Sequence, residues 1–336
     1  MSVAVEFDKV SIVFGDRPSS ALPLMDQGQT REDIKTATGQ VLGVHDCSLS
    51  VATGEILVLM GLSGSGKSTL LRAVNGLNPV CRGEVRISDA GEMVSVTHAD
   101  PATLRRLRLN RVAMVFQAFG LLPWRTVREN VGLGLELAGM KPAERRARVD
   151  EQLEMVGLSD WAGRKVDELS GGMQQRVGLA RAFATEAPIL LMDEPFSALD
   201  PLIRARLQDE LLELQQKLRR TIIFVSHDLD EAFKLGNRIA LMEGGRIVQA
   251  GTAREIIAAP ADAYVADFVA HMNPLGVLTA VDVARPGTAP GAPEIAPDAT
   301  VREVMALLVK TPELNVAGGG QISRESVLTR LIDPHS

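Results

Sequence analysis

The sequence is poor in cysteine, in aromatic residues and in long apolar runs, and it carries no excess of basic side chains. Its two cysteines, Cys47 and Cys81, show no paired spacing, which argues against a disulfide framework or a zinc site and fits a reducing cytosol. No apolar run approaches the roughly 20 residues needed to span a bilayer, and the N-terminal residues do not resemble a signal peptide. We therefore expect any membrane role to depend on a partner.

Composition sets the scale of the protein and the sign of its charge. A hydrophobic content of 46% over 336 residues supports a substantial core and about two domains. The formal net charge is −6, whereas nucleic-acid binding driven by phosphate neutralisation favours a basic face. We therefore expect no nucleic-acid partner.

A glycine-rich run follows a short apolar stretch. Residues Ile56 to Met60 are enough for a buried strand and too few for a helix, and the run from Gly61 to Thr69 reads Gly-Leu-Ser-Gly-Ser-Gly-Lys-Ser-Thr. Its glycines let backbone N–H groups approach phosphate oxygens, and the helix expected near Lys67 adds its positive end. We expect Lys67 to neutralise the β- and γ-phosphates of ATP, Ser68 to bind Mg²⁺ and Thr69 to contact the α-phosphate.

Two adjacent carboxylates end a second apolar run, Ile189 to Met192. Ligands gather at the carboxyl ends of strands in open parallel sheets, and neighbouring residues on a strand point in opposite directions. Asp193 is therefore the expected water-mediated ligand of Mg²⁺, and Glu194 is the expected general base that polarises the attacking water. Such a pair alone would indicate an ordinary solvated strand end, and the glycine-rich run decides against that interpretation.

Gln117 and His227 follow two further apolar runs, at residues 112–116 and 221–226. An isolated polar residue after a strand usually makes local hydrogen bonds in a loop. Both residues would nevertheless emerge at the same sheet edge as Glu194, where the γ-phosphate and its attacking water must lie. We therefore predict that Gln117, Glu194 and His227 are catalytic residues and that Gln117 also contributes to the Mg²⁺ site.

Six short motifs occur in the order that ATP-binding cassette (ABC) ATPases show, and about residues 1 to 270 resemble that family. The motifs are the Walker A run Gly61 to Thr69, the Q-loop Gln117, the signature Leu169 to Gln174, the Walker B strand ending at Glu194, the D-loop Ser197 to Asp200 and the switch His227. The resemblance implies an α/β fold, a P-loop ABC-type nucleotide-binding domain with a mixed-sheet core, an antiparallel β subdomain and a helical subdomain.

The resemblance also implies that two copies of the chain close around two molecules of Mg·ATP. The signature residues Ser170, Gly171 and Gly172 of one subunit would contact the γ-phosphate held by the other, and Ser170 is a residue type that caps helix starts. Phe14 matches the adenine-stacking aromatic of the family, with a core aromatic as the alternative. The expected nucleotide-binding residues are Phe14, Gly61, Leu62, Ser63, Gly64, Ser65, Gly66, Lys67, Ser68, Thr69, Asp193, Ser170, Gly171, Gly172, Gln174 and Asp200, and the expected metal-site residues are Ser68, Gln117 and Asp193.

An insertion from Arg17 to Leu42 indicates which branch of the ABC ATPases the chain resembles. Together with the segment Asp200 to Ile203, it is similar to the ATPase subunits of bacterial glycine betaine, proline betaine and choline importers. That similarity implies an ATPase homodimer at the cytoplasmic face of the bacterial inner membrane, bound peripherally to integral membrane permease subunits. A periplasmic or extracellular substrate-binding protein would capture the quaternary ammonium compound. The apolar segment Ala118 to Trp124 would receive the permease, unless it belongs to the core of the helical subdomain.

The expected ABC ATPase domain spans residues 1–272, with its helical subdomain at about 119–186. Proline and glycine at 285–293 predict a flexible linker, placed at 273–296. The small α/β tail at 297–336 resembles at most one truncated cystathionine-β-synthase-type (CBS) repeat, in which the glycines at 318–320 leave little strand before Ile322. Regulatory tails in the family carry a tandem pair, so the single repeat would pair with another subunit or be a remnant.

Three alternative functions remain open on sequence grounds. The first is import of a different small solute. The second is a soluble ABC ATPase outside transport, which would usually carry a coiled-coil insertion or two cassettes in one chain. The third is a small-molecule P-loop kinase, which would need neither Ser170 to Gly172 nor His227. The motifs favour an ATPase that powers transport.

Overall fold

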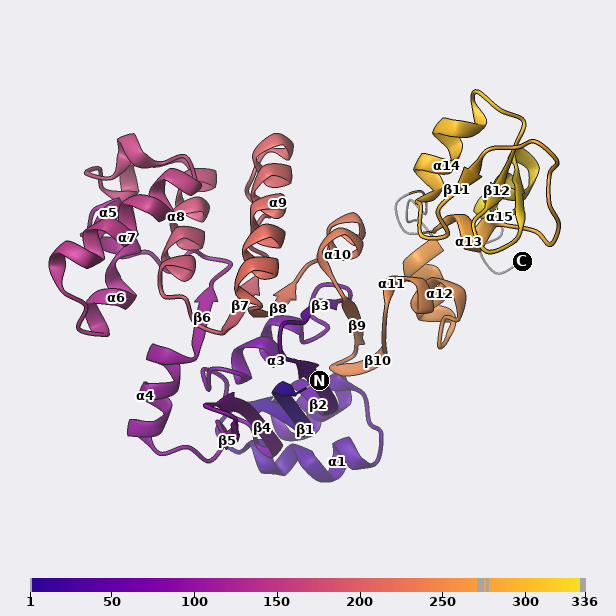
Figure 1. Cartoon of the computed structure of the whole chain (residues 1–336). Coiled ribbons are helices and arrows are strands. Elements are labelled where there is room, and N and C mark those ends of the chain that lie inside the picture. Colours follow the sequence, from indigo (N-terminus) through magenta and orange to yellow (C-terminus); the bar gives the residue numbers. More distant parts are fainter. Residues whose placement is uncertain (1, 271–274, 276–277, 333–336) are drawn as a thin grey trace. The chain divides into compact units, whose positions relative to one another are not determined.

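A computed structural model describes residues 2–270, 275 and 278–332 of the chain (Figure 1). The predicted domain boundary at 272–273 and the last four residues of the predicted tail lie outside this part of the chain. The chain divides into two compact units, Met1–His227 with Met242–Ile247 and Asp228–Leu241 with Val248–Ser336.

An antiparallel sheet is built from the N-terminal residues. Its strand order is β2-β1-β4-β5, and every neighbouring pair runs antiparallel. One face is apolar, with Val5, Phe7 and Val85 fully or almost fully buried. The strands are β1 Val3–Phe14, β2 Val41–Ala52, β4 Arg82–Asp89 and β5 Glu92–Ser95.

A second sheet has the order β10-β9-β3-β8-β7-β6. Its strands are β3 Ile56–Met60, β6 Val112–Val115, β7 Ile189–Asp193, β8 Thr221–Val225, β9 Arg238–Glu243 and β10 Arg246–Gly251. The strands β3, β7 and β8 are buried along their whole length and are apolar except for Asp193 and Thr221, as expected of parallel strands covered on both faces. Asp193 of β7 and Leu59 of β3 both lie opposite Val225 of β8, so the carboxyl ends of these strands are level.

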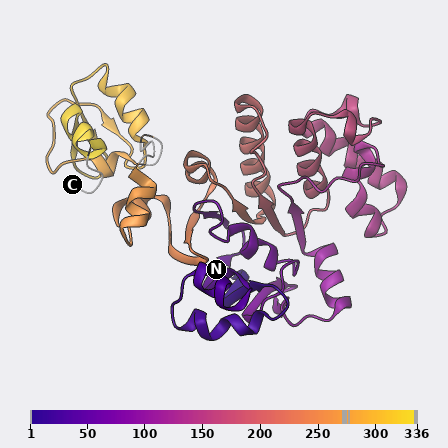
Figure 2. The ribbon, with the colours of Figure 1, turned by 180° about the vertical axis from the view of Figure 1, so that it is seen from behind.

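Helices surround the second sheet and extend from it. The helical subdomain between β6 and β7 contains α5 Val127–Val131, α6 Leu133–Leu137, α7 Pro142–Met155 and α8 Gly171–Ala184, with short 3-10 turns at Ser159–Trp161 and Val166–Glu168. Helices α5 and α7 pack against α8, and the group is drawn in magenta in Figures 1 and 2. The other helices of this unit are α3 Lys67–Ala73, α4 Pro101–Asn110 and α9 Pro201–Leu218. The expected arrangement of a sheet core, an antiparallel β subdomain and a helical subdomain is thereby confirmed.

The insertion is folded rather than irregular. It contains a 3-10 turn at Pro18–Ala21, then α1 Leu22–Asp26 and α2 Arg31–Thr38, between β1 and β2. Ala21, Met25 and Ile34 are buried in a small apolar core that also contains Val13 and Leu42. The insertion is therefore held in place on the β1–β2 hairpin by side-chain packing.

The second unit has its own apolar core. Its elements are α10 Leu229–Leu235, α11 Ala253–Ala258, α12 Ala263–Ala270, α13 Ala280–Val283, β11 Glu294–Ile295, α14 Val301–Leu308, β12 Glu313–Val316, β13 Gln321–Ser323 and α15 Arg324–Ile332. The third sheet has the order β11-β12-β13, with β11 and β12 parallel and β12 and β13 antiparallel. Leu278 and Ile295 share this core with Val304, Leu314 and Ile322.

Two expectations for the C-terminal region are wrong. The segment at 285–293 is not a free linker, because Arg285 exchanges two backbone hydrogen bonds of 2.9 Å with Gln321. The amide side chain of Asn315 also accepts from Ala289 N at 2.8 Å and donates to Ala289 O at 2.9 Å. The glycines at 318–320, with φ between 92° and 118°, make a turn between two strands instead of removing them.

Candidate functional site

The glycine-rich run forms a loop between β3 and α3. Gly61 and Gly66 have positive φ values of 137° and 103°. A side chain at Gly61 would place its Cβ 2.1 Å from Met242 O, and one at Gly66 would approach Gly43 O to 2.7 Å. Any larger residue at these two positions would clash with the neighbouring backbone and would also adopt an unfavourable φ. The loop can therefore pass this close to the neighbouring segments only because both residues are glycine.

Lys67 begins α3 and folds back over this loop. Its Nζ atom donates hydrogen bonds to Gly61 O at 2.8 Å and to Leu62 O at 2.9 Å. Burial lowers the pKa of Lys67, while the nearby carboxylates of Glu194 and Asp193 act in the opposite direction. The loop thus holds the ammonium group beside two carbonyl oxygens. Phosphate oxygens are equally suitable acceptors for its hydrogen bonds.

Asp193, at the end of β7, is fully buried and has two partners. Ser68 donates its Oγ proton to Asp193 Oδ1 at 2.6 Å, and Arg72 Nη2 lies 2.8 Å from Asp193 Oδ2. A buried carboxylate needs such partners because its desolvation is costly. Ser68 and Asp193 therefore present oxygen atoms side by side, which is the ligand type that suits Mg²⁺.

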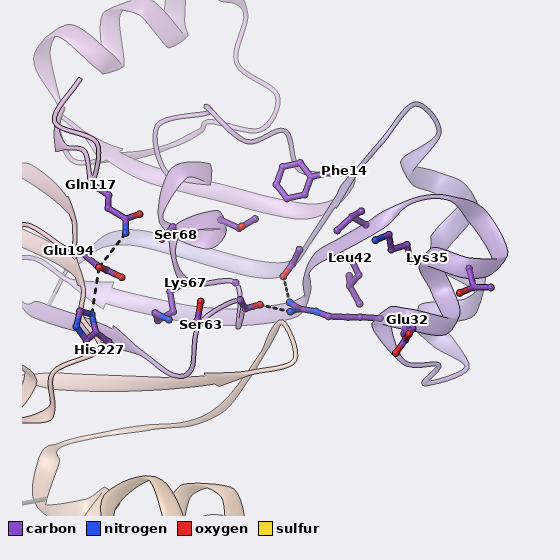
Figure 3. A pocket seen from close by; sticks show the side chains of 17 residues that line it. Phe14, Glu32, Lys35, Leu42, Ser63, Lys67, Ser68, Gln117, Glu194 and His227 are labelled. Carbon is purple, nitrogen blue, oxygen red and sulfur yellow. Dashed lines mark hydrogen bonds and ion pairs between the residues drawn. The ribbon is translucent and has the colours of Figure 1, made fainter. Parts of the chain in front are cut away.

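Glu194 is brought together with Gln117 and His227, as the strand ends predict. Gln117 Nε2 donates to Glu194 Oε2 at 3.3 Å, and His227 Nδ1 lies 3.5 Å from the same oxygen (Figure 3). The backbone of Glu194 has φ +48°, a left-handed conformation that is uncommon outside glycine and that is often found at functional sites. The three side chains can share a proton or a water molecule at the mouth of the phosphate loop.

One cavity of about 960 Å³ joins these features. Phe14, at the end of β1, lines it and is 39% exposed, so Phe14 is not a core aromatic. The predicted residues that line it are Phe14, Ser63, Gly64, Gly66, Lys67, Ser68, Thr69, Gln117, Glu194 and His227. The volume lies at the upper end of the range for small-molecule sites, and the cavity runs from an aromatic ring to a cationic loop.

The signature and D-loop residues do not line this cavity. Ser170 caps α8 by accepting from Met173 N at 3.4 Å, and Asp200 caps α9 by accepting from Ile203 N at 3.1 Å. Gln174 Nε2 donates to Val166 O at 2.9 Å and to Leu169 O. A Cβ at Gly171 would meet no atom within 4 Å, so α8 is open to an approaching group at this position, whereas a Cβ at Gly172 would lie 3.1 Å from Ala198 O.

Three residues that support the site had no distinct signal in the sequence. Arg72 holds Asp193. Gln175, 1% exposed on α8, donates to Glu194 O at 3.1 Å and accepts from Ala198 N at 3.0 Å. Arg181, also on α8, donates to Phe119 O at 2.8 Å and Gly120 O at 2.7 Å. Helical spacing from the signature places Gln175 on the inner face of α8, but only the fold reveals its partners.

The fold and the cavity define a P-loop ATPase, and comparisons with known proteins identify its family. A family model described as ABC transporter matches residues 44–197. The glycine betaine/proline betaine transport system ATP-binding protein of Escherichia coli (strain K12) is 49% identical over 285 residues, covering 85% of this chain and 70% of that relative. The chain therefore belongs to the ABC transporter family, and it is an ATP-hydrolysing subunit of that family.

Two further relatives and a solved structure support the assignment to the ABC transporter family. A glycine betaine transport ATP-binding protein of Bacillus subtilis (strain 168) is 48% identical, covering 83% of this chain and 66% of that relative. A trimethylamine N-oxide transport system ATP-binding protein of Ruegeria pomeroyi is 44% identical, covering 92% of this chain and 90% of that relative. A dimeric ATP-binding cassette solved with ADP and Pi has a TM-score of 0.64 at 30% identity, covering 74% of this chain and 98% of that one.

No helix within the described residues is both long enough and apolar enough to cross a membrane.

Proposed function

We propose that this subunit hydrolyses ATP to power the import of choline or glycine betaine through a partner permease. The observation that carries the ATPase part is that Lys67, Glu194 and His227 line the same cavity. The substrate class is supported by the names of the relatives that match most of the chain. We place the subunit peripherally at the cytoplasmic face of the bacterial inner membrane, where a permease would receive it.

The triphosphate is assigned to the phosphate loop, with the adenine on Phe14. Lys67 would exchange its two loop carbonyls for β- and γ-phosphate oxygens, and Thr69 would contact the α-phosphate. Ser68 and Asp193 would hold Mg²⁺ with Gln117, and the ion, when bound, would offset the negative charge that develops on the transferred phosphate. Arg72 keeps the Asp193 carboxylate oriented toward Ser68.

Glu194 is assigned as the general base for the attacking water. Gln117 and His227 both contact its Oε2 atom, so they limit the positions that the carboxylate can adopt. A base held within hydrogen-bond reach of the water accepts its proton as the water oxygen bonds to the γ-phosphorus and the bond to the β–γ bridging oxygen breaks, releasing ADP. His227 would then stabilise the transferred phosphate.

The signature is assigned to the nucleotide of a second copy. Ser170, Gly171, Gly172, Gln174 and Asp200 lie outside the cavity of their own chain, and the start of α8 is open at Gly171. N–H groups at a helix start attract phosphate oxygens, and this helix start lies outside the cavity that its own phosphate loop lines. A homodimer in which each α8 faces the partner's phosphate loop would complete both sites.

The permease is assigned to the segment Ala118 to Trp124. Trp124 is 68% exposed, and aromatic side chains of this kind are enriched in protein interfaces. Arg181 ties Phe119 and Gly120 to α8, the helix that begins with the signature. A movement of α8 on ATP binding would therefore reach the permease through this segment.

Uptake by cells that lack the subunit tests the substrate. Radiolabelled glycine betaine and choline should accumulate in wild-type cells under osmotic stress, and uptake of at least one should fall to the background level in the deletion strain. Plasmid-borne wild type and the surface variant Glu213→Gln should restore it. Unchanged uptake of both compounds would reject the substrate class and leave the ATPase assignment standing.

Trimethylamine N-oxide is the second candidate substrate. The relative that transports it matches 92% of this chain, more than the glycine betaine relatives do. All three compounds carry a trimethylated nitrogen, and measuring uptake of each labelled compound separately in the same strains distinguishes them. Loss of trimethylamine N-oxide uptake alone would select this candidate over choline and glycine betaine.

A further inference from the structure

The insertion between β1 and β2 contributes a rigid helix to the nucleotide cavity. Helix α2 begins at Thr30, whose hydroxyl accepts from Asp33 N while Asp33 returns a bond to the Thr30 backbone. The helix ends at Gly39 with φ +70°, the usual left-handed cap. Ile34 is fully buried on its inner face. Its outer face is therefore presented to the cavity in one fixed orientation.

Arg31 connects this helix to the phosphate loop. Its guanidinium donates to Gly64 O, which lies inside the loop, and to Gly43 O at 2.6 Å. A Cβ at Gly245 would come within 2.7 Å of Arg31 Nη2, so the group fits closely between three backbone segments. Burial lowers the pKa of Arg31, and its Nε atom has no hydrogen-bond partner within the described part of the chain.

Lys35 lies one helical turn after Arg31 and lines the same cavity. Figure 3 shows its nitrogen directed toward Leu42 and Phe14, whereas Lys67 lies toward Glu194 and His227. The cavity thus carries one lysine near the catalytic carboxylate and a second near the aromatic ring.

We propose that α2 is part of the ATP site, with Arg31 positioning the phosphate loop and Lys35 contacting the ribose and α-phosphate of the nucleotide. Arg31 acts through the Gly64 carbonyl, because both of its outer nitrogens already bind backbone oxygens. Lys35 is exposed and lines the cavity near Phe14, whereas Lys67 lies near Glu194 and His227 (Figure 3). When the base stacks on Phe14 and the γ-phosphate reaches Lys67, the ribose and α-phosphate lie next to the ring, in the cavity that Lys35 also lines. This inference rests on the proposed assignment of the cavity to ATP.

Calorimetric titration of the full-length protein with ATP and with ADP tests the proposal. Arg31→Gln should weaken both nucleotides at least about tenfold, because it removes two hydrogen bonds from a charged donor. Arg31→Lys, which can reach one carbonyl but not both, should lose less. Lys35→Gln should weaken both nucleotides about threefold and flatten the salt dependence of the affinity, since a partly exposed charge contact is screened by salt.

Two controls separate the possible failures. Asp26→Asn breaks the 2.7 Å ion pair with Arg82 elsewhere on the insertion and should leave nucleotide affinity unchanged. An equal loss in Asp26→Asn and Arg31→Gln would overturn the proposal, because it would indicate general loosening of the insertion. Lys67→Ala reports on the cavity itself. If Lys67→Ala loses affinity while Arg31→Gln, Arg31→Lys and Lys35→Gln all bind nucleotide as wild type does, only the role of α2 is rejected. If Lys67→Ala also binds nucleotide as wild type does, the cavity is not the ATP site.

Discussion

Replacing Glu194 by glutamine is expected to abolish turnover while leaving ATP binding intact. The substitution keeps the size of the side chain and its place between Gln117 and His227, but it removes the carboxylate that we propose accepts the proton of the attacking water. General-base catalysis typically contributes about a hundredfold to ten-thousandfold to a rate, so the ATPase rate should fall by about that factor. The rate of phosphate release at saturating Mg·ATP measures it.

The same variant should accumulate as an ATP-bound dimer. Without hydrolysis, the γ-phosphate that joins one phosphate loop to the partner's signature would remain in place. Size-exclusion chromatography with ATP should therefore show a dimer for Glu194→Gln, and ADP should not produce it. Glu213 is an exposed carboxylate on α9, so Glu213→Gln is the matched control. This variant should hydrolyse ATP at the wild-type rate. Near-normal turnover in Glu194→Gln would remove Glu194 from its assigned role.

Replacing Lys67 by alanine should instead weaken nucleotide binding itself. The substitution removes the cation that would bind the β- and γ-phosphates and also leaves Gly61 O and Leu62 O without their 2.8 and 2.9 Å partners. Hydrogen bonds to charged groups are worth about 1.5–3 kcal/mol, so the Kd for ATP should rise by about one to two orders of magnitude. Titration with ATP and with ADP measures this change.

Lys217→Ala is the matched control for that experiment. Lys217 lies on α9, where its side chain is 72% exposed and pairs with Glu213. It does not line the cavity. Its removal should leave the affinity for ATP unchanged. An unaltered affinity in Lys67→Ala would contradict the assignment of the phosphate loop.

The parts of the site that the sequence predicts are those set by local sequence. Strands β3, β6, β7 and β8 are short and mainly apolar, and the residues proposed to act on ATP lie at or just beyond their carboxyl ends. Because parallel strands end level, Gln117, Glu194 and His227 could be expected to meet before any distance was known. Ser170 likewise caps α8 because its residue type and its glycine neighbours favour a helix start.

The parts that sequence analysis missed depend on contacts between distant segments. Arg31 and Gln175 act on backbone atoms of Gly64 and Glu194, and no pattern in the sequence marks a carbonyl as a partner. The segment at 285–293 was misread for the same reason. Its glycine and proline content indicates flexibility, but the side chain of Asn315 satisfies the backbone of Ala289 from 26 positions away.

The turnover per subunit as a function of protein concentration tests the central claim most directly. If the signature of one copy completes the phosphate site of the other, full-length protein diluted at saturating Mg·ATP should lose activity per subunit steadily and approach zero. The activity should return on reconcentration. A turnover per subunit that stays constant down to concentrations at which the protein is monomeric would show that one chain hydrolyses ATP alone, and it would contradict this account.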